Sequence, residues 1–505
     1  MTHKLGWRSC AATALLATFL ASVAHAAKSP YAETVIVNGK VITADSDDPE
    51  KISFKQAIAI QGDRILAVGN NEEIRKLVAD WTEVIDAKGN SVIPGLIDTH
   101  NHIYETATGF PWVVKSLPEL LEIQLRGESK DQLVDLVHKA VAARARQIPQ
   151  DQWIRVGMRP ASMAVKSFGS DITRATLDEA APSHPVFVST RGGSVLNSSA
   201  IAAIEKYYGH TLPADYWMEG AEIGWSGEYT DFSRCIGLDL ISTKPGNFDT
   251  YIKGYFEVMQ ANAQIGVTTH KSHLQCEAGF SASSHLARND LMPIRMAWGH
   301  RWMQPFSDSI KETYRRIGDW TGYGSDFLWS IGSSVGGIDA GGVGWCTSIP
   351  ADDDIKSREQ CPPAPEGVEV RGIEPVNTVN NRARRTEHLV TLAELAGEGR
   401  ISGIPGWHVS GDGALELLFR TYMANMPDER IRALRIESDH CHGVTQEQIE
   451  LAVRLNHTFS CDATDVPTQV LKEGYGEEYL TINSPVASML KAGARAVISE
   501  YGIQG

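Results

Sequence analysis

Two histidines two positions apart, His100 and His102, close an apolar stretch that begins at Ser91. Side chains of a strand alternate between its two faces, so residues two apart project the same way and both imidazoles can grip one metal ion. A Pro-Gly pair within the stretch and an aspartate two residues before His100 accompany them. Two polar residues in a turn at a strand end are the simpler alternative, but this context favours metal binding.

Three further polar residues follow apolar stretches later in the chain: His408, His440 and Glu500. With the first pair they make three or four imidazoles and a carboxylate, which is a zinc-type ligand set. Zinc lowers the pKa of bound water toward neutrality and polarises a substrate carbonyl. Glu500 is the candidate proton shuttle, because a nearby carboxylate can take the water proton and return it to the leaving group.

Each of these three residues has an alternative interpretation. His408 lies between an apolar strand and a helix, where it could serve in capping or in the core. For His440, a hydrogen bond to the substrate competes with metal ligation. Glu500 stands near the chain end and could be a surface acid.

The pattern of strands and helices that would position these residues predicts an α/β fold. Counting the strand before His100, eight apolar stretches alternate with helical patterns, which is the count of a (β/α)8 TIM barrel. The seven later stretches cover residues 266–270, 293–298, 327–331, 406–409, 434–436, 457–461 and 494–498. Catalytic residues of such barrels sit at the C-terminal ends of the strands.

The chain is expected to divide into three parts. Residues 1–26 have a basic start, an apolar stretch and an Ala-His-Ala cleavage site, which together predict a signal peptide and a periplasmic or secreted protein. Residues 27–92 read as short strands of a small N-terminal β-sandwich-like module. Residues 93–505 hold the barrel, with a long insertion at about 105–265 in which only residues 153–157 and 185–189 read as strands.

Charge, hydrophobicity and cysteine content indicate which kinds of partner and which disulfides to expect. Removing the predicted signal takes Lys+Arg from 47 to 45 against 62 acids, a formal charge of −17, which disfavours nucleic-acid binding. No later segment is long and apolar enough to span a membrane. Six cysteines remain without a Cys-x-x-Cys pair; Cys346 with Cys361 is the best candidate disulfide, and free buried thiols are the alternative. A small-molecule substrate is expected, and a homo-oligomer is possible.

The chain resembles the amidohydrolase superfamily, in the branch that includes N-substituted formamide deformylases. The resemblance rests on the segments 37–42, 60–69, 92–102, 197–200 and 408–414 and on the pair Asp439-His440. It implies a metal-dependent hydrolase on a distorted (β/α)8 barrel capped by a small sandwich. It assigns His100 and His102 to strand one, His408 to strand five and His440 to strand six.

Three departures from the family pattern shape the expectations. Trp329 stands near the position of a metal-bridging lysine on strand four, so one metal ion is favoured over two; Lys271 could substitute but belongs to the wrong strand. Ser499-Glu500 replaces the Ser-Asp pair of strand eight. The last barrel helix and the C-terminal sandwich strands of the family are missing, so a fragment or truncated reading frame is one interpretation.

These observations predict an exported zinc hydrolase that cleaves an amide-type C–N bond of an N-acyl or N-formyl amine. Two alternatives stay open. One is a truncated or impaired family member that binds metal or a small ligand without turnover. The other is a metal-dependent lactonase or phosphotriesterase, which uses similar ligands.

Overall fold

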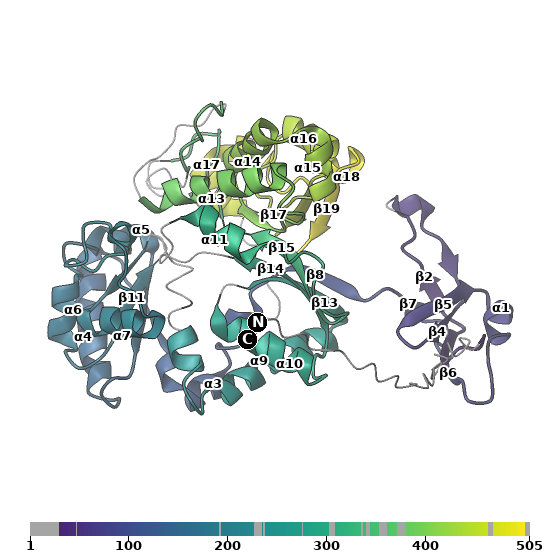
Figure 1. Ribbon diagram of the computed structural model, residues 1–505, viewed down its shortest axis with the longest axis horizontal. Coiled ribbons are helices and arrows are strands. Elements are labelled where there is room, and N and C mark those ends of the chain that lie inside the picture. Colours follow the sequence, from purple (N-terminus) through teal and green to yellow (C-terminus); the bar gives the residue numbers. More distant parts are fainter. Residues whose placement is uncertain are drawn as a thin grey trace, which may run out of the picture. The chain divides into compact units, whose positions relative to one another are not determined.

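The computed structural model describes residues 30–499 with several gaps, and the chain divides into two compact units, Met1–Pro94 and Gly95–Gly505. The gaps are residues 47, 191–192, 227–234, 236–237, 275, 302–308, 335–336, 340–343, 353–360, 371–379 and 463–467. Figure 1 shows the helices and strands of each unit. In the described part of the chain, no helix is long and apolar enough to cross a membrane.

The N-terminal unit contains two small sheets. The four-stranded sheet has the order β5-β4-β1-β6, and the three-stranded sheet has the order β3-β2-β7. The strands are β1 (Thr34–Val37), β2 (Lys40–Ile42), β3 (Phe54–Lys55), β4 (Ala57–Gln61), β5 (Arg64–Gly69), β6 (Glu83–Asp86) and β7 (Ser91–Val92). Antiparallel β4 and β5 turn at Gly62, as the Gly-Asp signal predicted. Helix α1 (Asn71–Arg75) begins with a capping box between Asn70 and Glu73.

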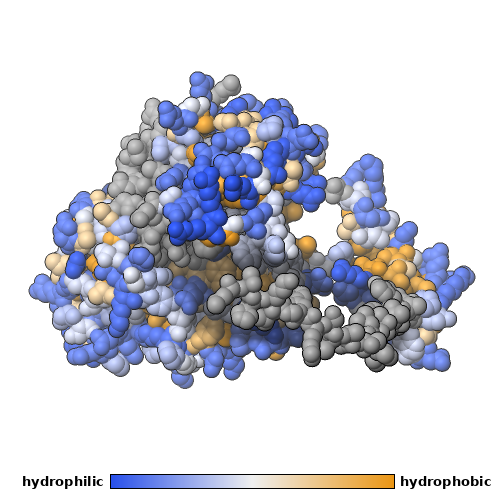
Figure 2. Space-filling view, in the orientation of Figure 1, coloured by the Kyte–Doolittle hydropathy of each residue, from blue (hydrophilic) through white to orange (hydrophobic). Residues whose placement is uncertain are grey.

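Part of the surface of this unit is apolar. Ile65 on β5 and Val84 and Ile85 on β6 are exposed, and Figure 2 shows hydrophobic surface on the same unit. The small core beneath lies between the sheet and α1 and contains Val35 and Ile74.

Eight parallel strands form the centre of the larger unit. They are β8 (Leu96–Asn101), β13 (Val267–Leu274), β14 (Arg295–Arg301), β15 (Leu328–Ser334), β16 (Trp407–Val409), β17 (Glu437–His440), β18 (Thr458–Cys461) and β19 (Arg495–Ile498). They pair as two parallel sheets of four, in the orders β15-β14-β13-β8 and β16-β17-β18-β19. The number of strands and their alternation with helices agree with the prediction.

The predicted closed barrel is instead two half-sheets among the described residues, because no ladder joins β15 to β16 or β8 to β19. Local contacts link the halves. The Ser333 amide donates to the Gly403 carbonyl at 3.1 Å, and the Ser334 hydroxyl donates to the Gly406 carbonyl at 2.8 Å. On the other side, the hydroxyls of Thr99 and Ser460 lie 2.8 Å apart.

The sixth strand is displaced from its prediction at 434–436. Leu434 ends helix α15 (Asp428–Leu434), and Arg435 caps it in the left-handed conformation. The strand is the following polar segment, Glu437–His440. The prediction failed because hydrophobicity was used to find strands, whereas this strand carries polar side chains that are buried against one another.

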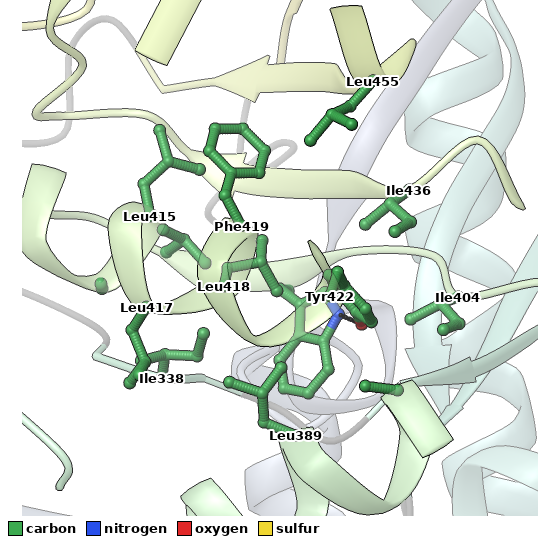
Figure 3. Close-up of a cluster of buried hydrophobic side chains, with 14 of the residues drawn as sticks. Ile338, Leu389, Ile404, Leu415, Leu417, Leu418, Phe419, Tyr422, Ile436 and Leu455 are labelled. Atoms are coloured by element: carbon green, nitrogen blue, oxygen red, sulfur yellow. Dashed lines mark hydrogen bonds between the residues drawn. The ribbon is translucent and has the colours of Figure 1, made fainter. Parts of the chain in front are cut away.

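Helices follow most strands and cover the two sheets. They include α9 (Phe248–Gln264), α10 (Glu277–Arg288), α11 (Ile310–Ile317), α13 (Asn380–Gly397), α14 (Asp412–Asn425), α16 (Gln446–Leu455), α17 (Thr468–Tyr479) and α18 (Val486–Lys491). Three of the helical patterns that alternate with the apolar stretches in the sequence correspond to α13, α14 and α16. Figure 3 shows α14 packing Leu415, Leu418, Phe419 and Tyr422 into the largest buried cluster.

The long insertion is more regular than expected. It contains its own four-stranded sheet in the order β12-β11-β10-β9, with helices α4, α6 and α7 around it in Figure 1. These elements are β9 (Glu122–Arg126), β10 (Ile154–Arg159), β11 (Val186–Thr190), β12 (Gly193–Leu196), α4 (Lys130–Ala145), α6 (Arg174–Ala180) and α7 (Ser198–Tyr208). The two strands predicted here, now β10 and β11, are confirmed; β9 and β12 were missed.

The six cysteines that follow Cys10 in the sequence form three disulfides. Cys346–Cys361 is the predicted pair, and Cys235–Cys276 and Cys441–Cys461 complete the set. The alternative of free buried thiols is therefore wrong.

Truncation of Leu418, which is fully buried in the cluster of Figure 3, tests this core. We expect Leu418→Ala to lower the free energy of unfolding by about 2–5 kcal/mol, because it removes buried methyl groups and leaves a cavity. Urea unfolding monitored by circular dichroism measures the change. Leu490→Ala is the control, since Leu490 is 54% exposed; equal losses in both variants would contradict this packing.

His457 provides a pH test of the same core. Its ring lies between Phe419 and Phe459, Nε2 is 2.8 Å from the Ser438 hydroxyl, and burial lowers the pKa to about 3. Because the folded pKa is below the unfolded value, stability is complete above about pH 6.5 and falls as the pH drops, by about 2 kcal/mol at pH 5. We expect His457→Gln to lose less stability than wild type between pH 7.5 and 5 in urea unfolding. An unchanged pH dependence would refute this role.

Candidate metal centre

Four imidazoles from three strand ends converge in the larger unit. His100 is the penultimate residue of β8, His102 follows that strand, His408 lies on β16 and His440 ends β17. The ring centroid of His100 lies 4.9 Å from that of His102, 4.8 Å from that of His408 and 4.9 Å from that of His440. The four histidines singled out in the sequence therefore meet, although more than 300 residues separate the first pair from the others.

Three of these side chains have the spacing of metal ligands. One ring nitrogen from each of His100, His102 and His408 can be chosen so that all three lie within 4.8 Å of one another. The Nε2 atoms of His100 and His102 are 3.1 Å apart. Two nitrogens bound to one tetrahedral zinc ion lie about 3.3 Å apart, so the pair fits a shared ion.

The opposite nitrogen of three of the rings lies beside a polar group. His100 Nδ1 is 3.2 Å from an oxygen of Asp439, and His102 Nδ1 is 3.1 Å from the hydroxyl of Tyr104. His440 Nδ1 is hydrogen-bonded to the carboxylate of Asp462. A carboxylate at Nδ1 holds the proton there and leaves the Nε2 lone pair for a metal ion. The residues present therefore fit a divalent cation.

The backbone near His440 is shaped to present this ring. His440 and Cys441 both have positive φ, 82° and 44°, so the chain turns sharply where β17 ends. The disulfide from Cys441 to Cys461 ties this turn to β18, whose register places His440 opposite Cys461. Asp462, the next residue, reaches back to His440.

A glycine lets β16 approach the centre. Gly406 has φ +54°, and a Cβ there would lie 2.4 Å from the His273 ring and 2.7 Å from the Asp439 carboxylate. Only a residue without a side chain fits this contact. His408, two residues later, is thereby brought beside His100.

Burial and local charge shift the acids around the histidines in opposite directions. Burial raises the pKa of Asp98 to about 6, although its oxygens accept bonds from the His100 amide and the Asn101 side chain. Burial also acts to raise the pKa of Asp462, but the hydrogen bond and charge of His440 outweigh it and hold the pKa below its usual value. The site therefore keeps Asp462 ionised.

The sequence analysis missed a second group of polar residues, on β13 and β17. His273 Nε2 lies 3.1 Å from Asp439, and Lys271 Nζ donates to Glu437 at 2.6 Å and to Asp439 at 2.9 Å. His273 has no potential ligand at metal-binding spacing near it in the sequence. A usable signal was present: Lys271 and His273, like Glu437 and Asp439, are two positions apart in strands and therefore share a face.

This group excludes Lys271 as a replacement for the metal-bridging lysine. Burial alone would lower its pKa, but the charges of Asp439 and Glu437 raise it, so the side chain remains an ammonium. Carbamylation requires a neutral amine. The same ammonium overcomes the effect of burial on Asp439 and holds the pKa of that carboxyl well below its usual range.

Other candidates lie elsewhere. Glu500 is outside the described residues, so its role as proton shuttle stays a prediction; Ser499 before it donates a hydrogen bond to Asp462. Asp412 accepts hydrogen bonds from Thr347 and Ser348 and thereby holds the segment that contains these two residues. His300 packs against Phe280, and burial lowers its pKa to about 2.

Sequence relatives share part of the chain. It is 32% identical over 156 residues to the N-substituted formamide deformylase of Arthrobacter pascens, covering 31% of this chain and 26% of that protein. It is 27% identical over 173 residues to Protein LONG AFTER FAR-RED 3 of Arabidopsis thaliana, covering 34% and 26%. The matched segments thus span about a quarter of the length of these curated relatives.

The fold has a solved counterpart, and a family model covers most of the chain. An uncharacterized metal-dependent hydrolase from Pyrococcus horikoshii OT3 matches with a TM-score of 0.57 and 18% identity over 93% of this chain and 82% of that one. This likeness supports a TIM-barrel-like α/β fold. Residues 83–499 match the sequence model of the amidohydrolase family, and the chain therefore belongs to that family.

Proposed function

We propose that this protein is a metal-dependent hydrolase that cleaves an amide-type C–N bond, with an N-acyl or N-formyl amine as substrate. The observation that carries the proposal is the convergence of four buried or largely buried imidazoles, three of which have ligand spacing, in a chain of the amidohydrolase family. The partial similarity to a formamide deformylase supports the choice of substrate class.

His100, His102 and His408 would hold one divalent ion, which we propose to be zinc. Imidazole nitrogens suit zinc, and three protein ligands leave a position open, as in catalytic zinc sites. When bound, the ion supplies an acidified water and polarises the substrate carbonyl. A second ion has no bridging lysine available, because Lys271 is paired with Glu437 and Asp439.

His440 would act on the substrate or complete the ligand set. Asp462 holds its Nδ1, so its Nε2 side is oriented toward the cluster in which His100 and His408 lie. From there the ring can hydrogen-bond the carbonyl oxygen and stabilise negative charge that develops on it. Glu500 remains our proposed proton carrier between the attacking water and the leaving amine.

A second candidate function is metal or ligand binding without turnover. Trp329 occupies the approximate position of the missing lysine, and the ammonium of Lys271 is committed to two carboxylates. A lactonase or phosphotriesterase is a further alternative, because such enzymes use similar ligands.

Metal analysis and a substrate panel test the proposed reaction. We expect about one zinc ion per chain, with measurable hydrolysis of N-formyl or N-acyl amines. His408→Ala should lose most of the bound zinc and at least about a thousandfold in rate, because it deletes a ligand. His300→Gln, a change at a half-buried histidine outside the cluster, should leave the bound zinc in place.

The possible outcomes separate the candidates. Zinc without turnover of any amide, lactone or phosphotriester would favour the binding protein. Turnover of lactones or phosphotriesters alone would favour the other hydrolases. A wild-type protein that binds no divalent metal would refute both the proposed metal site and the proposed reaction.

We also propose that the protein is exported to the periplasm or beyond. The apolar segment after Lys4 and Arg8 supports this, and so does the pairing of all six later cysteines, because disulfides persist in oxidising compartments. A small-molecule substrate without nucleic-acid partners suits the acidic net charge, and assembly into a homo-oligomer remains a prediction.

A reporter fusion tests export. Residues 1–30 fused to a phosphatase that folds only in the periplasm should give active reporter in a Gram-negative host. Leu16→Arg should abolish that activity, because a charge interrupts the apolar segment. An inactive wild-type fusion, or activity that survives the arginine, would count against the signal peptide.

A further inference from the structure

The carboxylate of Asp439 is the meeting point of three nitrogen groups. Asp439 is fully buried on β17. Its Oδ2 lies 3.1 Å from His273 Nε2 and 3.2 Å from His100 Nδ1, and its Oδ1 accepts a hydrogen bond from Lys271 Nζ at 2.9 Å. Both oxygens are therefore already engaged, one by two imidazoles and the other by an ammonium.

Lys271 balances the negative charge of Asp439 in this group of residues, which we call the hub: Asp439, Lys271, His273 and His100. Its side chain is also buried, and Nζ donates a second hydrogen bond, to Glu437 at 2.6 Å. A buried carboxylate is tolerated when it is paired and hydrogen-bonded, and Asp439 meets both conditions. The hub spans the two half-sheets, because Lys271 and His273 belong to β13 whereas Asp439 belongs to β17.

The same residues invite a different interpretation. His100, His273 and Asp439 also have the spacing of a three-ligand metal group. A cation there would lie near the Lys271 ammonium, and the two positive charges would repel each other in a poorly solvated interior. Such a cation would also have to displace the contacts that the His100 and His273 imidazoles make with Asp439 Oδ2. The charge balance thus favours a hydrogen-bonded clamp over a second metal site.

We propose that Asp439, supported by Lys271, is a positioning residue that orients His100 toward the metal centre and keeps that centre mononuclear. The inference rests on the proposed metal-dependent function. His100 Nδ1 lies 3.2 Å from Asp439 Oδ2, and His100 Nε2, on the other side of the ring, lies 3.1 Å from His102 Nε2. A carboxylate in this place also increases the basicity of the ligand histidine.

Asp439→Asn tests the clamp, because it keeps the shape but removes the charge. We expect zinc affinity, measured by competition with a chromophoric chelator, to fall about 10–100-fold. The visible absorption spectrum of the Co²⁺-substituted protein should also change, which a merely structural defect away from the centre would not cause. Asp239→Asn is the matched control: Asp239 is a buried acid that binds the Glu277 and Ala278 amides.

The number of metal ions bound per chain tests the proposal that the centre is kept mononuclear. Mass spectrometry of metal content should give one ion in wild type, and still one in His273→Asn, with affinity within about threefold because Asn can donate to Asp439. Two ions in wild type, falling to one in His273→Asn, would overturn the clamp in favour of a second site.

Further outcomes distinguish the inference from the function on which it rests. One tightly bound ion in wild type, with unchanged affinity and Co²⁺ spectrum in Asp439→Asn, would refute the clamp but leave the hydrolase standing. No metal in wild type would defeat both. If Asp439→Asn does not fold, Lys271→Gln replaces it, with an expected loss of about tenfold in zinc affinity; unchanged affinity there would refute the clamp.

Discussion

The interaction on which the larger unit depends is the buried pairing of Lys271 with Glu437 and Asp439. It joins β13 of one half-sheet to β17 of the other, where no backbone ladder among the described residues connects these two strands. Burying the charges of Lys271 and Asp439 carries a large desolvation cost, and their attraction offsets it only with good geometry and further hydrogen bonds, one of which Lys271 donates to the partly buried Glu437. His273 and His100 supply further nitrogen contacts at Asp439, so the pairing and the candidate metal centre share one carboxylate.

This sharing explains the arrangement of the centre. The ends of β8, β16 and β17 contribute the histidines. A polar neighbour orients three of the rings: Asp439 lies beside His100, Tyr104 beside His102 and Asp462 beside His440. Asp439 lies on strand β17, Asp462 directly follows strand β18 and Tyr104 lies on the short helix Ile103–Thr106, so each supporting group is held by regular structure that limits the freedom of the rings. The disulfide between Cys441 and Cys461 fixes the turn at the end of β17 in the same way, by tying it to the neighbouring strand.

The features that could be read from the sequence were those with a local signature. The His100–His102 spacing, the alternation of apolar strands with helices and the short loop between Cys346 and Cys361 each depend on neighbouring residues. The features that were missed depend on distant pairing. His273 and Asp439 are 166 residues apart, and the strand at Glu437–His440 was predicted three residues too early, at 434–436, because its side chains are buried by partners rather than by hydrophobicity.

The sequence alone determined the family, the ligand type and the order in which the histidines occur, because motif spacing and strand periodicity are local properties. Only the tertiary structure decided which acid serves which imidazole, that Lys271 remains an ammonium, and that the strands pair as two half-sheets. These properties depend on which side chains lie together in a buried, poorly solvated space. Such neighbours come together only when segments far apart in the chain fold against one another.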